Sequence, residues 1–153
     1  MRREPLHPAG LLAGLAGLLA VAGCKGDPAP SSPESGEPAH TLVTHEVFRI
    51  DLAPLPPCTI GATCEARLVL HALGGYKVNA EYPTKFVGDE AATALDGTGT
   101  FATEAKTRGV MTVRFRPTAA GTARVSGAFK LSVCTDAVCK IEAPQVAFDV
   151  PVS

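Results

Sequence analysis

The residues of this chain best suited to covalent chemistry are its five cysteines, and their spacing sorts them into three groups. Cys24 stands alone near the start, Cys58 and Cys64 are separated by five residues, and Cys134 and Cys139 by four. Two nearby thiols can form a disulfide staple or exchange electrons with the thiols of a second protein. The four later cysteines allow three disulfide connectivities, and the short spacing favours the local pairs Cys58–Cys64 and Cys134–Cys139.

The first two dozen residues predict export, which sets the oxidation state expected for those thiols. Two arginines precede an uncharged run over 11–22. A membrane-spanning helix needs roughly 20 apolar residues, so this shorter run is typical of a secretory signal. Residues 21–24, Val-Ala-Gly-Cys, resemble the lipobox of bacterial lipoproteins. The resemblance implies removal of a signal peptide over 1–23 and acylation of Cys24, so that lipid rather than a helix anchors the mature chain to a membrane.

A polar segment over 24–41 separates this anchor from the rest of the chain. It is rich in Pro, Ser and Gly and has no large apolar side chain, which predicts a disordered tether. A single domain over 42–153 remains. Lys25, rather than Asp, follows the lipidated position, which favours the outer membrane of the bacterial cell envelope, with the domain facing the periplasm. Because the periplasm is oxidising, the four cysteines of the domain are expected to form two disulfides.

Apolar and polar side chains alternate through the domain, a pattern typical of half-buried strands. About seven short strands predict an all-β fold, an immunoglobulin-like β-sandwich. A turn at 117–121 predicts a hairpin between the strands beside it, and 89–96 has the composition of one or two helical turns. The expected strands are 48–52, 64–71, 110–116, 122–133 and 146–152, with weaker ones at 76–78 and 85–87.

Strand phase gives the two cysteine pairs different surroundings. Cys64 falls on an inward face, which predicts a structural disulfide with Cys58. Val133 is inward, so Cys134 points outward, and its pair with Cys139 lies at a hairpin tip. Accessible disulfides are typically the labile or catalytic ones, whereas a plain hairpin staple is the alternative that the residues themselves leave open.

A family resemblance is carried by the segments Leu73–Asn79 (LGGYKVN), Gly121–Val125, Val133–Cys139 and Glu142–Pro144 and by the last residues Val150–Val152. These segments resemble the N-terminal periplasmic domain of DsbD-type thiol:disulfide interchange proteins. The resemblance implies an immunoglobulin-like fold over roughly 45–152 and a redox pair, in which Cys139 exchanges with the partner and Cys134 resolves. An aromatic cap over that pair is also implied, for which Phe86 and Phe101 are the candidates.

The chain departs from that family's pattern in three ways. Its turn between Cys134 and Cys139 is one residue shorter, Cys58–Cys64 has no counterpart, and a fused membrane electron-transfer domain like that of the family is not expected. The resemblance therefore implies two kinds of partner, a periplasmic thiol–disulfide protein and a separate membrane electron donor.

Other chemistries are disfavoured by composition and spacing. A formal net charge of -1 excludes nucleic-acid binding driven by global charge. The cysteine spacings fit zinc knuckles poorly, and His45 and His71 are single outward histidines, so no metal or cofactor is expected. Two functions stay open: thiol–disulfide exchange through Cys134 and Cys139, which would be an enzymatic activity, or a non-enzymatic lipoprotein. In the second, both disulfides are structural and the immunoglobulin-like domain binds a protein or the envelope.

Overall fold

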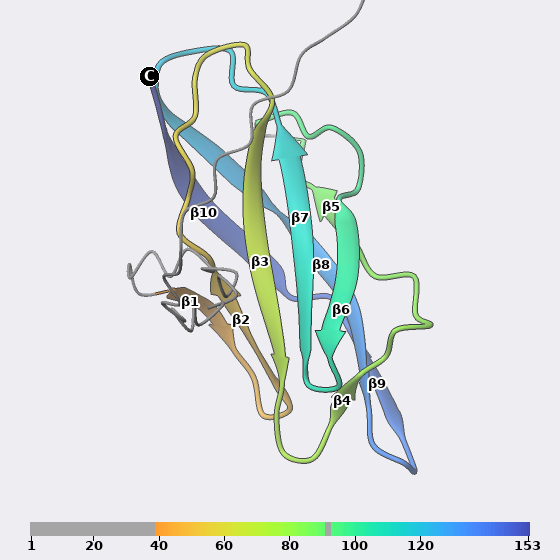
Figure 1. Ribbon diagram of the computed structural model, residues 1–153. Helices are drawn as coiled ribbons and strands as arrows, with labels where there is room; N and C mark the ends of the chain where they lie inside the picture. Colours follow the sequence, from red (N-terminus) through yellow and green to blue (C-terminus); the bar gives the residue numbers. More distant parts are fainter. Residues whose placement is uncertain (1–38, 91–92) are drawn as a thin grey trace, which may run out of the picture. The chain divides into compact units, whose positions relative to one another are not determined.

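A computed structural model describes residues 39–90 and 93–153 (Figure 1). The predicted signal peptide over 1–23, the predicted lipidation site Cys24 and all but the last three residues of the predicted tether lie outside the described residues. No helix in the described part is long and apolar enough to cross a membrane. The strands are β1 (His40–Thr44), β2 (Phe48–Leu52), β3 (Cys64–Ala72), β4 (Lys77–Val78), β5 (Lys85–Gly88), β6 (Thr100–Ala105), β7 (Arg108–Phe115), β8 (Gly121–Cys134), β9 (Cys139–Glu142) and β10 (Gln145–Val152).

These strands form two antiparallel sheets that pack face to face (Figure 1). One sheet has the order β1-β2-β3-β7-β6. The other is built on β8, with β9 and β10 along one edge and β4 and β5 along the opposite edge. The order β2-β3-β7-β6 against β5-β8-β10 is the ABED and CFG arrangement of constant-type immunoglobulin domains. The predicted all-β, immunoglobulin-like sandwich is therefore confirmed.

The core lies between the two sheets, where the inward residues of the alternating strands meet. Along β8 every second residue from Ala123 to Val133 is buried. Among these buried residues Gly127 has no side chain, and it lies opposite Gly88 of β5. A Cβ atom at residue 127 would lie only 2.8 Å from the Gly88 Cα. The two glycines therefore allow the backbones of β5 and β8 to approach each other closely. The largest fully buried side chains are those of Phe48, Phe86, Phe115 and Phe129.

All seven strands predicted from alternation are present, and three more were not predicted. The additional strands β1, β6 and β9 bury little. Strands β1 and β6 show no regular alternation of burial, and β9 alternates over only four residues, with its apolar ones outward. In β6, for example, Phe101 is the one residue that is even partly buried. Strand β1 begins at His40, two residues inside the segment predicted as tether.

The hairpin predicted at 117–121 is wrong. Strand β7 pairs with β3 and β6, whereas β8 lies in the other sheet, so this turn carries the chain from one sheet to the other. A turn signal marks a reversal of direction but not the partner of the next strand. The helical turns considered for 89–96 are also not found in its described residues, where Leu95 forms a bridge with Phe115 and Thr93 N–H donates to the Arg124 carbonyl (2.9 Å).

Candidate functional site

The tip of the β8–β9 hairpin carries a disulfide between the last residue of β8 and the first residue of β9. Cys134 and Cys139 lie directly opposite each other, with their Cα atoms 4.0 Å apart. This short separation fits a non-hydrogen-bonded position of an antiparallel pair, where the two side chains are closest. The second sheet therefore places both sulfurs at the very end of its longest strand.

The exchanging sulfur expected from the resemblance is open to solvent. Cys139 is exposed and Cys134 partly exposed, as strand phase predicted for Cys134. Figure 1 shows the hairpin projecting beyond the neighbouring strands. Four large apolar side chains are exposed in the described residues, and two flank this disulfide: Val138 is 52% exposed and Ile141 is 65% exposed. We call Val138, Cys139 and Ile141 the tip surface. An exposed apolar surface beside an exposed disulfide is suited to contact with another protein.

The turn that carries the tip surface is held by its own hydrogen bonds. Thr135 N–H donates to the Val138 carbonyl (2.8 Å). The Thr135 hydroxyl oxygen accepts from Ala137 N–H (3.3 Å) and from Val138 N–H (3.1 Å). Threonine hydroxyls stabilise turns in this way. The turn therefore positions Cys139 and leaves it exposed.

Two lysines lie close to the disulfide, one on each face of the hairpin. Lys77 of β4 pairs with Cys134, and its Nζ lies 2.7 Å from Asp136 Oδ1. The hydrogen bond from Lys77, together with its charge, lowers the pKa of Asp136. Lys140 lies on the inward face, where its Nζ is 5.7 Å from the centroid of the Tyr76 ring, within cation–π range. The Asp136 carboxylate beside the sulfurs is thus charge-compensated.

Neither candidate for an aromatic cap lies over the disulfide. Phe86 is fully buried in the core. Phe101 packs edge-on against Phe129, with ring centroids 6.3 Å apart, and lies over the backbone of Gly109. The expectation that one of them covers the redox pair is therefore wrong. Both side chains fill the sandwich because their strands, β5 and β6, flank its interior.

The second disulfide lies at the other end of the sandwich and is buried. Cys58 and Cys64 are 3% and 6% exposed, with Cα atoms 5.5 Å apart. Cys64 pairs with Phe115 at the end of β7, and Cys58 forms a bridge with Val152 at the end of β10. Ser153 N–H also donates to the Cys58 carbonyl (3.0 Å). This bond joins the segment before β3 to both sheets, which is the position of a structural staple.

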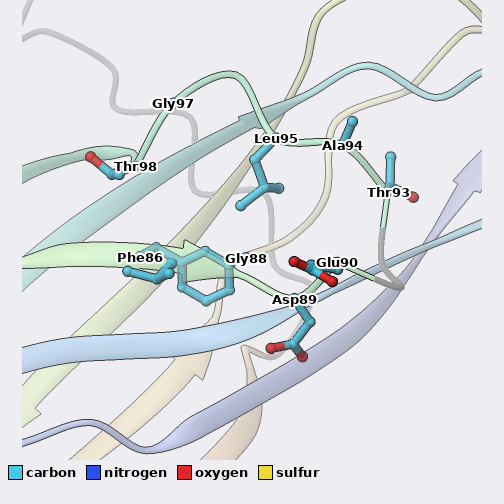
Figure 2. Close-up of a pocket in the computed structure, with 10 residues that line it drawn as sticks. Phe86, Gly88, Asp89, Glu90, Thr93, Ala94, Leu95, Gly97 and Thr98 are labelled. Atoms are coloured by element: carbon cyan, nitrogen blue, oxygen red, sulfur yellow. The ribbon is translucent and has the colours of Figure 1, made fainter.

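A cavity of about 330 Å³ lies beside β5, away from either disulfide. Its floor is apolar, and Leu95 reaches from the loop on one side toward Gly88 on the other (Figure 2). Two carboxylates, Asp89 and Glu90, line its rim (Figure 2). The other polar side chains among the described lining residues are the hydroxyls of Thr93 and Thr98 (Figure 2).

The histidine singled out on β3 belongs to a charge cluster on the outer face of the first sheet. Asp51, 4% exposed, accepts from the Thr41 hydroxyl (2.8 Å) and lies 2.9 Å from Arg49 and 3.3 Å from His71 Nε2. Burial lowers the pKa of His71, Arg49 lowers it further, and Asp51 acts in the opposite direction. These contacts tie β1, β2 and β3 together, which gives the cluster a structural role.

Within residues 39–90 and 93–153, no group of three or more His, Cys, Asp or Glu side chains is placed to hold a metal ion. His45, the other histidine considered, stacks on Phe48 with ring centroids 4.5 Å apart. Comparisons of the chain with protein-family models, with curated proteins and with solved structures found no match. The candidate site is therefore defined by the geometry of the hairpin.

Sequence reasoning identified the two cysteines of the site but did not place four other residues beside them. Val138 and Ile141 were not singled out, although apolar residues beside a tip cysteine were a usable signal. Tyr76 and Lys77 belong to a segment that carries the resemblance, but nothing in the sequence placed them at the hairpin, which they reach through pairing of β4 with β8. Only the sheet brings these distant segments together.

Proposed function

We propose that this chain is a lipid-anchored, periplasm-facing module that exchanges thiols and disulfides with a partner protein through Cys134 and Cys139. Cys139 is the sulfur that the partner attacks, and Cys134 is the resolving sulfur. The resemblance to the N-terminal domain of DsbD-type proteins suggests this assignment, and the fold and the hairpin geometry are compatible with it.

The contrast between the two disulfides is the observation that carries the proposal. Cys58 and Cys64 are buried where the two sheets meet the end of the chain. Cys139 is exposed at a projecting tip between two exposed apolar side chains. A bond that serves only as a staple gains nothing from an exposed apolar surround, which is normally an unfavourable feature of a soluble surface. Access to a sulfur is a requirement of exchange.

The exchange step balances with a partner dithiol as the reductant. A partner thiolate attacks the Cys139 sulfur, the bond to Cys134 breaks, and the Cys134 thiolate leaves and takes a proton from water. The second partner thiol then attacks its neighbour in the mixed disulfide and releases Cys139 as a thiol. The partner is oxidised by two electrons and the hairpin is reduced, and the reverse sequence passes the electrons on.

Location follows from the sequence of the N-terminal region. The short uncharged run over 11–22 and the lipobox-like residues 21–24 support export, cleavage and acylation of Cys24. Lys25 supports attachment at the outer membrane of a bacterial envelope. From there the hairpin would meet a periplasmic thiol–disulfide protein, and a separate membrane protein would supply electrons.

The reduction potential of the hairpin tests this proposal. The full chain carrying Cys24→Ser is equilibrated in glutathione buffers, and the thiols are alkylated and located by mass spectrometry. We expect Cys134–Cys139 to have a potential of about -180 to -230 mV, the range of exchange proteins. Cys58–Cys64 is the internal control and should stay oxidised throughout. A value below about -300 mV for the hairpin would contradict the proposal.

One observation favours the alternative, a non-enzymatic lipoprotein whose disulfides are both structural. The hairpin turn is short and closed by the hydrogen bonds of Thr135, as in a stapled recognition loop. In that function Val138 and Ile141 would bind a protein or an envelope component without any exchange. The two candidates separate in the same titration, because the alternative requires the low potential of a staple.

A further inference from the structure

Strand β9 has a free edge, and the hydrogen-bond phase of the hairpin decides which residues face it. Thr135 N–H bonds to Val138, so this pair is hydrogen-bonded. Because such pairs alternate in an antiparallel ladder, Cys134–Cys139 and Ser132–Ile141 are non-hydrogen-bonded pairs. The backbone N–H and C=O groups of Cys139 and Ile141 therefore point away from β8.

Other contacts of β8 agree with this phase. Ser132 uses its carbonyl on the opposite side of β8, where it accepts from Asn79 N–H (3.0 Å), and Phe129 N–H donates to Pro144 on the β9 side (3.0 Å). Pro151, which lacks an N–H, occupies an edge-facing position of β10, opposite Thr122. Among the described residues β9 pairs with β8 alone, and no loop or turn hydrogen bond of the backbone reaches Cys139 or Ile141.

From this geometry we infer that the redox partner docks as an extended strand along the free edge of β9, with its reactive cysteine opposite Cys139. This inference rests on the proposed function and names the form of its partner. Unpaired edge groups bind an added strand through backbone hydrogen bonds, and side-chain pockets give specificity. The exposed Ile141 side chain, on the same face as Cys139, would meet an apolar residue two positions before the partner's cysteine.

Strand addition also sets up the chemistry. A residue hydrogen-bonded to Cys139 across an antiparallel ladder has its Cα about 5.5 Å away. That distance lies inside the range that a disulfide spans, roughly 4.4–6.8 Å, so the mixed disulfide forms without moving the strands. The partner's sulfur approaches from the side of β9 opposite to β8. The incoming sulfur, Cys139 and the leaving Cys134 thus follow one line across the strands, as displacement at sulfur requires.

The rest of this edge is less suited to an added strand. Pro144 precedes β10 and Pro151 lies within it, and proline commonly protects sheet edges. Strand β9 has no proline, and its one lysine, Lys140, is turned to the inward face beside Tyr76. The stretch of edge that lacks protection is thus the stretch that carries the reactive sulfur.

A pair of synthetic peptides tests the inference on the full chain carrying Cys24→Ser. One peptide has the sequence TVTCVTV. The other is identical but carries N-methyl groups on the cysteine and on the valine two positions before it. The methyl groups remove the two N–H donors that would bond to the backbone carbonyls of Cys139 and Ile141 in β9. We measure the rate at which each peptide forms a mixed disulfide with Cys139 and divide it by the peptide's own rate with glutathione disulfide. Reduced glutathione is reacted with the same protein as the reference thiol. The unmethylated peptide should react about tenfold faster, since each lost hydrogen bond weakens docking.

Two proline variants locate the effect on the edge. Ile141→Pro removes an N–H group that faces the free edge. Proline is already accommodated at such an edge-facing position in β10, at Pro151. Ala147→Pro is the matched control, edge-facing but in β10, opposite Ser126. Ile141→Pro should bring the unmethylated peptide down to the methylated rate, whereas Ala147→Pro should leave the rates of both peptides unchanged.

The outcomes separate this inference from the proposed function. Equal rates for the two peptides, with glutathione still reacting at Cys139, would overturn strand docking and leave exchange standing. Failure of glutathione and both peptides to react at Cys139 would overturn both. The peptide comparison needs neither proline variant, so it decides the question even if Ile141→Pro does not fold.

Discussion

Replacing each disulfide by a pair of alanines should separate the staple from the exposed bond. The two loops are nearly equal in length, since the cysteines are 6 and 5 positions apart in sequence. Loop-closure entropy therefore assigns about 2.4 kcal/mol to Cys58–Cys64 and about 2.2 kcal/mol to Cys134–Cys139. On chain entropy the two pairs of substitutions would be almost indistinguishable.

Burial makes the expected stability contributions of the two disulfides different. Cys58 and Cys64 are 3% and 6% exposed, so deleting their sulfurs also leaves a cavity, which adds roughly 1–2 kcal/mol. Cys139 is exposed, and the Thr135 hydrogen bonds keep the turn when the bond is removed. We expect Cys58→Ala with Cys64→Ala to cost about 3.5–4.5 kcal/mol. The hairpin pair should cost about 2 kcal/mol or less.

Urea unfolding followed by circular dichroism measures this difference, because the chain has no Trp to report by fluorescence. All variants carry Cys24→Ser, and the parent with that change is the reference. Equal losses, or a larger loss for the hairpin pair, would refute the reasoning that burial distinguishes the two bonds. It would also remove the contrast on which the exchange function rests.

Three further predictions concern the sandwich. Gly127→Ala should lower the free energy of unfolding by roughly 1–3 kcal/mol or more in urea, since a Cβ there would strike the backbone of β5; Ser126→Ala is the control on the same strand. The folded-state pKa of His71 lies below its usual value, so folding is favoured above about pH 6.5 and stability falls as the pH drops below it. The urea midpoint should decline from pH 8 to pH 5.5, and His71→Gln should flatten that decline; an unchanged slope would contradict the shift. Because the Phe101 ring occupies the space of a Cβ at residue 109, Gly109→Ala should cost less in a Phe101→Ala background than alone. A double-mutant cycle measured by urea unfolding checks this, and additive losses would show that the ring and the glycine are not coupled.

The sandwich keeps its two disulfides apart, which suits the two roles assigned to them. The buried bond joins both sheets at the end where β10 finishes, and the exposed bond lies at the far end of β8. Reduction of the hairpin opens a tip whose register is also held by the β4 pairing at Lys77. We therefore expect the fold to persist through a redox cycle, because the core and the staple are untouched by it.

The sequence by itself determined the strands that bury a face, because alternation with period two reports burial directly. It placed Cys64 inward and Cys134 outward, as the burial of Cys64 and the partial exposure of Cys134 show. The short spacings also pointed to the pairs that the structure joins, since nearby cysteines need little chain to meet. These features are local, so the order of residues is enough to reveal them.

Tertiary structure decided everything that depends on which strands become neighbours. The turn at 117–121 reads as a hairpin, yet β7 and β8 lie in different sheets because each buries its apolar face from an opposite side of the core. Strand β9 alternates over only four residues and turns its apolar side chains outward, and its free edge exists only because β8 pairs with it on one side. Lys77 meets Asp136 across 59 positions of sequence through the β4–β8 pairing. Such contacts arise from packing whole sheets together, and no local pattern records them.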